Sequence, residues 1–156
     1  MKIKLNADGQ LEFDDNGNLL PGIFEITIEE IEKYYSFSPK RKMLINGLKE
    51  MLEALKDIGC KFFYLDGSFA TDKLEPGDFD ACWELHSNID LDKLKKKYPE
   101  LLLFNPPRTE QKSKYLGEAL ISNQPLIDEL GNKVLTLDFF QKDRAMRPKG
   151  ILLIKL

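Results

Sequence analysis

The chain is poor in the residues that build zinc sites and disulfide frameworks. Its 156 residues include only two cysteines, Cys60 and Cys82, and a single histidine, His86. Two isolated cysteines match neither a zinc-ligand spacing nor a disulfide framework, and His86 has no partner at ligand spacing. Both cysteines lie in runs typical of strands, so we expect reduced thiols in the core of a cytoplasmic protein.

Long apolar runs are also lacking. No stretch approaches the roughly 20 apolar residues that cross a bilayer. The start, residues 1–5, leads into polar residues without the apolar segment of a signal peptide. We therefore expect no membrane partner. Internal repeats, low-complexity stretches and long linkers are missing too, which favours a single domain over residues 1–156.

An excess of basic charge is a third feature that the chain lacks. Lys and Arg number 23 against 26 Asp and Glu, for a net charge of −3. Proteins that bind a duplex usually carry a net basic face, so this balance disfavours nucleic acid as the main partner. The hydrophobic share of 42% and charged share of 31% are ordinary for a globular domain. A chain of this length can bury a core without disulfides or a structural metal.

Helix and strand signals alternate after a loop-rich N-terminal arm over residues 1–26. A capping box at Thr27 and Glu30 begins a short helix, and Ser38 with Pro39 begins a long one. The patterns predict helices over 28–35, 39–58, 90–97 and 109–120, and strands over 61–65, 78–85, 101–104, 134–140 and 151–154. This interleaving predicts an α/β or α+β class, with a mixed β-sheet flanked by helices.

The strand predicted over 78–85 opens with two carboxylates. Successive strand side chains point to opposite faces, so Asp78 and Asp80 share one face and Trp83 lies on the other, apolar face. Without a partner, two neighbouring carboxylates repel each other and raise each other's pKa. A divalent cation removes that penalty, and oxygen ligands of this kind suit Mg²⁺ or Mn²⁺.

A third acid, Asp138, lies in the otherwise apolar run 134–140. A carboxylate buried in such a strand is costly unless it is paired or liganded. If this strand neighbours the first, Asp138 completes a three-carboxylate cluster able to hold two metals. Two metals can align a nucleotide's phosphates, activate a hydroxyl and stabilise pyrophosphate. Pairing with a lysine or arginine explains Asp138 equally well.

Gly67 and Ser68 follow the strand predicted over 61–65 and supply the complementary half of a nucleotide site. A glycine at a strand end lets the backbone approach a phosphate closely, and Ser68 can donate from its hydroxyl. A helical turn starting at Ser68 would add free amides. Lys73 lies in the same segment and could neutralise phosphate charge, although a solvated turn lysine is the simpler interpretation.

These motifs carry a resemblance. Gly67-Ser68, a spacer of nine residues, Asp78-Phe79-Asp80 and a later Asp138 together resemble the polymerase-β-type nucleotidyltransferase superfamily. The chain is most similar to its minimal bacterial members, some of which are encoded beside toxin or antitoxin partners. The longer run 64–80 also resembles an uncharacterised bacterial family of nucleotidyltransferase-like proteins.

The resemblance implies a mixed sheet flanked by helices and a metal-dependent enzyme. Such an enzyme moves a nucleoside monophosphate from a triphosphate such as ATP to an acceptor hydroxyl. Asp78, Asp80 and Asp138 would be the catalytic acids and ligands of Mg²⁺ or Mn²⁺, and Gly67 and Ser68 would hold the triphosphate. The net negative charge of the chain favours a protein or small-molecule acceptor over RNA.

A second hypothesis is a catalytically inactive module of the same fold, such as an antitoxin or a regulatory partner. Asp66 favours it, because the superfamily usually has an apolar residue at that position. The small size of the chain favours it as well, and is also consistent with a protein partner or a homodimer that completes the acceptor site. Retention of all three acids favours the enzyme.

Overall fold

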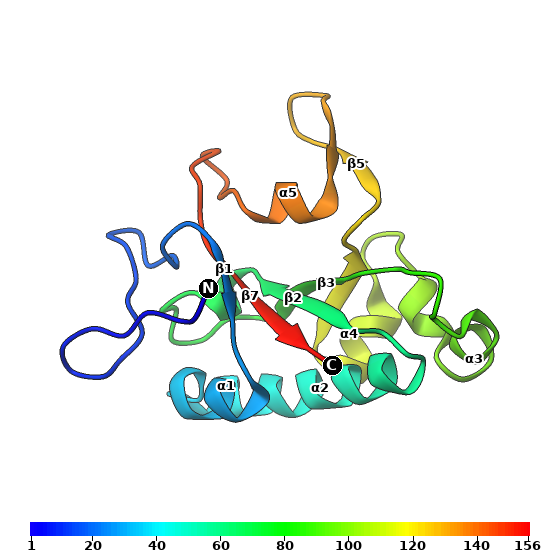
Figure 1. Cartoon of the computed structure of the whole chain (residues 1–156), viewed down its shortest axis with the longest axis horizontal. Coiled ribbons are helices and arrows are strands. Elements are labelled where there is room, and N and C mark those ends of the chain that lie inside the picture. Colours follow the sequence, from blue (N-terminus) through cyan, green and yellow to red (C-terminus); the bar gives the residue numbers. More distant parts are fainter.

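The computed structural model describes residues 1–156 as an α+β fold around a mixed sheet of five strands in the order β1-β7-β2-β3-β4 (Figure 1). The strands are β1 (Ile23–Glu25), β2 (Phe62–Asp66), β3 (Phe79–Trp83), β4 (Gly117–Ile121) and β7 (Ile151–Lys155). The outer pairs β1/β7 and β3/β4 are parallel, whereas β7/β2 and β2/β3 are antiparallel. The predicted mixed sheet is confirmed, as are the strands predicted near β2, β3 and β7.

Two consecutive helices, α1 (Ile28–Tyr35) and α2 (Pro39–Asp57), cover one face of the sheet (Figure 1). Both begin as predicted: Thr27 and Glu30 form a capping box, and the Ser38 side chain accepts a hydrogen bond from the Arg41 amide. The apolar stripe of α2 packs on the side chains of alternate strand residues, which project from the sheet face that the two helices cover. The main buried members of this core are Leu44, Leu48, Met51, Leu55, Phe63, Leu65, Phe79, Ala81, Trp83, Leu152 and Ile154.

The crossover from β3 to β4 contains α3 (Leu91–Lys97), the 3₁₀ turn η2 (Pro99–Leu102) and α4 (Thr109–Tyr115). Two predictions are wrong here. Residues 101–104 form no strand, because the chain coils into η2 after Tyr98. The helix predicted over 109–120 ends at Tyr115, because Leu116 adopts a left-handed conformation with φ of 62° and β4 follows at once.

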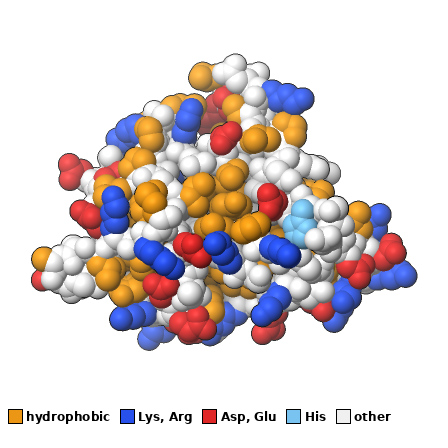
Figure 2. All heavy atoms as spheres, in the orientation of Figure 1, with side chains coloured by type: hydrophobic (Ala, Val, Ile, Leu, Met, Phe, Trp, Pro, Cys, Tyr) orange, Lys and Arg blue, Asp and Glu red, His pale blue; other side chains and the backbone are white.

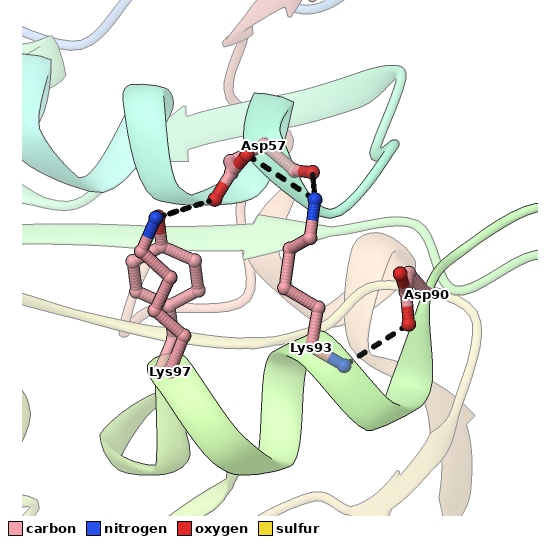
Figure 3. Close-up of polar contacts among 5 residues, drawn as sticks. Asp57, Asp90, Lys93 and Lys97 are labelled. Atoms are coloured by element: carbon pink, nitrogen blue, oxygen red, sulfur yellow. Dashed lines mark hydrogen bonds and ion pairs between the residues drawn. The ribbon is translucent and has the colours of Figure 1, made fainter.

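Ion pairs fix α3 against the end of α2. The Asp57 carboxylate lies 3.5 Å from Lys93 Nζ and 3.2 Å from Lys97 Nζ (Figure 3). It also accepts a 2.6 Å hydrogen bond from the Tyr98 hydroxyl. The hydrogen bonds from Tyr98 and Lys97 hold the pKa of Asp57 down at about 2. The lysine-rich helix is therefore attached by its charged face as well as by buried Leu94.

The opposite face of the sheet carries a separate layer, which we call the overhang and define as residues 124–149. It contains the two-stranded hairpin β5 (Pro125–Ile127) and β6 (Lys133–Leu135) and the short helix α5 (Thr136–Phe140). Figure 1 shows α5 and β5 on the side away from α1 and α2. The strand predicted over 134–140 is wrong beyond Leu135. The chain turns there because Thr136 donates to the Gln124 carbonyl through both its amide and its hydroxyl, at 3.0 and 2.9 Å.

The N-terminal arm packs beside the loop that follows β2. Residues 1–22 form only isolated bridges, which pair Leu5 with Leu11, Phe13 with Leu19, and Lys2 with Glu25 of β1. The Asp72 amide donates to the Gly17 carbonyl at 3.1 Å, which ties this arm to the segment between β2 and β3.

Both acidic and basic side chains are found on the molecular surface. On the side viewed in Figure 2, acidic and basic side chains are interspersed around a central group of hydrophobic side chains. None of the helices has both the length and the apolar character that a membrane crossing requires.

Candidate functional site

Three carboxylates converge on the sheet face beneath the overhang. Asp78 immediately precedes β3, Asp80 lies within it, and Glu118 lies on the neighbouring parallel strand β4. Asp80 and Glu118 are register partners, so their side chains leave the same face of the sheet. One oxygen of each of the three carboxylates lies within 4.8 Å of the others. Hard oxygen ligands at this spacing fit a divalent cation such as Mg²⁺ or Mn²⁺.

The protein environment raises the pKa of two of these carboxylates, Asp78 and Asp80. Burial raises the pKa of Asp80 to about 7, and the hydrogen bond to Glu118 and repulsion from Asp78 act in the same direction. Burial also raises the pKa of Asp78, against the opposing attraction of Lys112. A bound cation would favour the ionised form of both groups.

Helix α4 supplies cations to the same group. Arg108 Nη1, just before the helix, lies 3.1 Å from Glu118 Oε2. Lys112 Nζ lies 3.8 Å from Asp78 and 3.7 Å from Glu118. The carboxylates are therefore partly balanced by charges from the protein itself.

Asp66 extends the row of acids onto a third strand. It is the register partner of Asp80 on β2 and is only 5% exposed. Its carboxylate forms an ion pair with Lys149 of the overhang, with Nζ and Oδ1 2.9 Å apart. Burial raises the pKa of Asp66, and Lys149 opposes this shift. Asp66, the acid at a position where the superfamily usually has an apolar residue, is thus charge-balanced by a lysine distant in the chain.

Gly67 brings the backbone into contact with Asp80. Its φ is 73°, and a Cβ at this position would lie 2.3 Å from Asp80 Oδ2. Ser68 begins the single 3₁₀ turn η1 (Ser68–Ala70), in agreement with the predicted helical turn. Any larger residue at position 67 would disturb both the loop and the carboxylate.

Arg41 of α2 organises the loop that follows η1. Its guanidinium is fully buried and donates to the backbone carbonyls of Phe69 at 2.8 Å, Thr71 at 2.7 Å and Lys73 at 2.7 and 2.9 Å. Burial lowers the pKa of Arg41 to about 10. No sequence pattern marked this residue, because its partners are main-chain atoms of a segment some 30 residues away.

A cavity of about 800 Å³ lies between the sheet and the overhang. Volumes of 300–1,000 Å³ are typical of small-molecule sites. Its lining includes five of the six residues that the sequence singled out, namely Gly67, Ser68, Lys73, Asp78 and Asp80. The N-terminal arm contributes Asn18 to the same cavity lining. Segments far apart in the sequence therefore meet at one site.

Asp138, the sixth of these residues, lies elsewhere. It is exposed on α5 and belongs neither to the cavity lining nor to the group of three carboxylates. Its neighbours Phe139 and Phe140 line the cavity instead. Glu118 occupies the third position, and sequence reasoning missed it because the helix of α4 was extended across it. Gly117 was the available signal, since glycine commonly follows the last turn of a helix.

The fold and the cavity define an α+β protein with a carboxylate-lined site on one face of a mixed sheet. Residues 11–155 match a family of unknown function, DUF6932, and the chain belongs to this family. No curated protein and no solved structure matches the chain.

Proposed function

We propose that the chain is a metal-dependent nucleotidyltransferase that moves a nucleoside monophosphate from a nucleoside triphosphate to an acceptor hydroxyl. The observation that carries this proposal is the convergence of Asp78, Asp80 and Glu118 in a cavity that Gly67 and Ser68 also line. The sequence resemblance to polymerase-β-type nucleotidyltransferases supports the same activity.

The carboxylate group would hold Mg²⁺ or Mn²⁺. Oxygen ligands from Asp78, Asp80 and Glu118 suit these cations. Burial is the main cause of the raised pKa of Asp80, and repulsion from Asp78 adds to it. Glu118 takes the role that the sequence assigned to Asp138. When bound, such ions supply charge neutralisation for the triphosphate and for the departing pyrophosphate.

The residues of the chain would position the substrates. The Ser68 hydroxyl and the Gly67 backbone contact the phosphates, and Lys73 on the same loop balances their charge. The acceptor oxygen forms a bond to the α-phosphorus while the bond from that phosphorus to the bridging oxygen breaks, which releases pyrophosphate. The hydroxyl proton passes to a carboxylate oxygen of the group formed by Asp78, Asp80 and Glu118. The net charge of −3 favours a protein or small-molecule acceptor over RNA. We also infer a cytoplasmic location, because Cys60 and Cys82 are buried free thiols.

A second candidate function is a catalytically inactive binding module, such as an antitoxin or a regulatory partner. One observation favours it: Arg108 and Lys112 already pair with Glu118 and Asp78. These ion pairs would balance the acids in a protein that never binds a cation.

Calorimetry with ATP, GTP, CTP and UTP, in Mg²⁺ and then in EDTA, separates the two functions. For the enzyme we expect Mg²⁺-dependent binding that the double variant Asp78→Asn/Asp80→Asn loses. The matched control is Asp138→Asn, which removes an equivalent carboxylate outside the cavity and should bind like the wild type. Absence of triphosphate binding by the folded wild type would contradict the enzyme and favour the binding module.

A further inference from the structure

Two adjacent aromatic side chains face the cavity from the overhang. Phe139 and Phe140 of α5 both line it and are both partly exposed. Their ring centroids are 6.3 Å apart and their planes are inclined at 51°. Neither side chain belongs to the buried core cluster or packs against it. Packing in that core therefore does not explain two phenylalanines on a five-residue helix.

The cavity has two chemically different walls. The sheet wall holds the carboxylates with Gly67 and Ser68, where metal and phosphates would lie. The overhang wall carries the two rings, which are the only aromatic side chains in the lining, together with the charged residues Glu129, Lys142, Asp143, Arg144 and Lys149. A nucleoside triphosphate has the same division, with an anionic end and a flat aromatic end.

We propose that Phe139 and Phe140 form a stacking platform for the base of the nucleotide. This inference rests on the proposed function and adds to it the way in which the substrate is held. Phenylalanine rings offer a π-face but no hydrogen-bond donor or acceptor, so they bind a base by its surface and not by its edge. The platform therefore favours the larger purines and discriminates weakly between ATP and GTP.

The test compares ligands with and without a base. Binding of ATP and of inorganic tripolyphosphate, both with Mg²⁺, is measured by calorimetry for the wild type and for Phe139→Leu/Phe140→Leu. Leucine keeps the apolar character of the wall and removes the π-face. We expect the double variant to bind ATP about tenfold or more weakly, in line with base–aromatic stacking elsewhere. Tripolyphosphate binding should not change.

The matched control is Ile127→Ala, an exposed apolar residue of the same overhang that does not line the cavity. It should leave both affinities unchanged, and the thermal transition of each variant verifies folding. Wild type that binds ATP no more tightly than tripolyphosphate, or a double variant that retains wild-type ATP affinity, would overturn the platform and leave the nucleotidyltransferase proposal standing. Failure of the wild type to bind either ligand would overturn both.

Discussion

Gly67 shows at the scale of one residue how the loop and the carboxylates depend on each other. Its positive φ of 73° is combined with a ψ of −166°, a region that is almost restricted to glycine. The absence of a Cβ also leaves room for Asp80, whose Oδ2 would otherwise lie 2.3 Å from it. Backbone conformation and close contact therefore require glycine at this position independently.

Replacement of Gly67 by alanine should destabilise the protein by at least about 2 kcal/mol and abolish nucleotide binding, because the new methyl group displaces the Asp80 carboxylate. Urea unfolding and calorimetry measure the two effects. Gly9→Ala is a control for a positive φ alone, since Gly9 has a φ of 75° and nothing lies within 4 Å of its Cβ. That control should cost only about 1 kcal/mol. Equal losses in both variants would disprove the collision with Asp80.

Single residues were predictable where a short local pattern defines their surroundings. Asp78 and Asp80 could be assigned to one face because strand alternation acts over two residues. The ion pair of Asp66 with Lys149 could not be predicted, because it joins residues on two segments 83 positions apart. Local alternation says which way a side chain points, whereas only the tertiary fold says what it meets.

At the scale of elements, α2 both covers the core and holds the loop from Ser68 to Lys73. Arg41 lies on the buried side of this helix with no carboxylate partner, and its guanidinium donates four hydrogen bonds of 2.7 to 2.9 Å to backbone carbonyls instead. The guanidinium also lies 4.2 Å from the Phe37 ring centroid and 5.0 Å from that of Phe69. The loop from Ser68 to Lys73 is therefore fixed by a helix that contributes nothing to the cavity lining.

Replacement of Arg41 by methionine should lower the free energy of unfolding by about 3 kcal/mol or more, because several buried carbonyls lose their donor. Nucleotide affinity should fall with it, since the loop carrying Ser68 and Lys73 is released. Chemical denaturation and calorimetry measure both quantities. Lys42→Met, on the exposed side of the same helix, changes the same charge and should have little effect on either. A variant as stable as Lys42→Met would show that Arg41 does not fix the loop.

The elements with strong end signals were predictable, and those without them were not. Thr27 and Ser38 are N-caps as predicted, which made α1 and α2 readable from the sequence. The helix predicted over 90–97 is confirmed as α3, with Asp90 as its N-cap. By contrast, α4 has no capping side chain at its start, and both residues flanking it, Arg108 and Leu116, are left-handed. The reversal at Thr136 depends on Gln124 and Ser122, two carbonyls that approach only in the folded chain.

At the scale of the whole molecule, the buried carboxyl group of Asp80 opposes folding at neutral pH when no cation is bound. The pKa of Asp80 is raised to about 7, mainly by burial, against about 3.9 in an unfolded chain. Between roughly pH 4 and pH 7 the folded protein therefore holds a proton that the unfolded chain has lost. The free energy of unfolding should fall as pH rises through this window.

Urea unfolding in EDTA should show a different pH dependence of the free energy of unfolding for the wild type and for Asp80→Asn. The wild type should lose on the order of 2 kcal/mol more than the variant between pH 4.5 and pH 8, because the asparagine does not titrate. Asp138→Asn, an exposed acid, should retain the wild-type dependence. Parallel profiles for wild type and Asp80→Asn would show that the Asp80 carboxyl ionises normally.

Register pairing also sets the lateral spacing of the acids. Asp66, Asp80 and Glu118 sit opposite one another on three adjacent strands, and peptide hydrogen bonding holds neighbouring strands about 4.8 Å apart. The distance between neighbouring acids along the row is therefore set by main-chain hydrogen bonding and does not depend on which side chain is present. Exchange of aspartate for glutamate alters how far an oxygen reaches above the sheet, but hardly alters the spacing along the row. A family built on this sheet can therefore vary the depth of its site while the lateral interval between its acids stays constant.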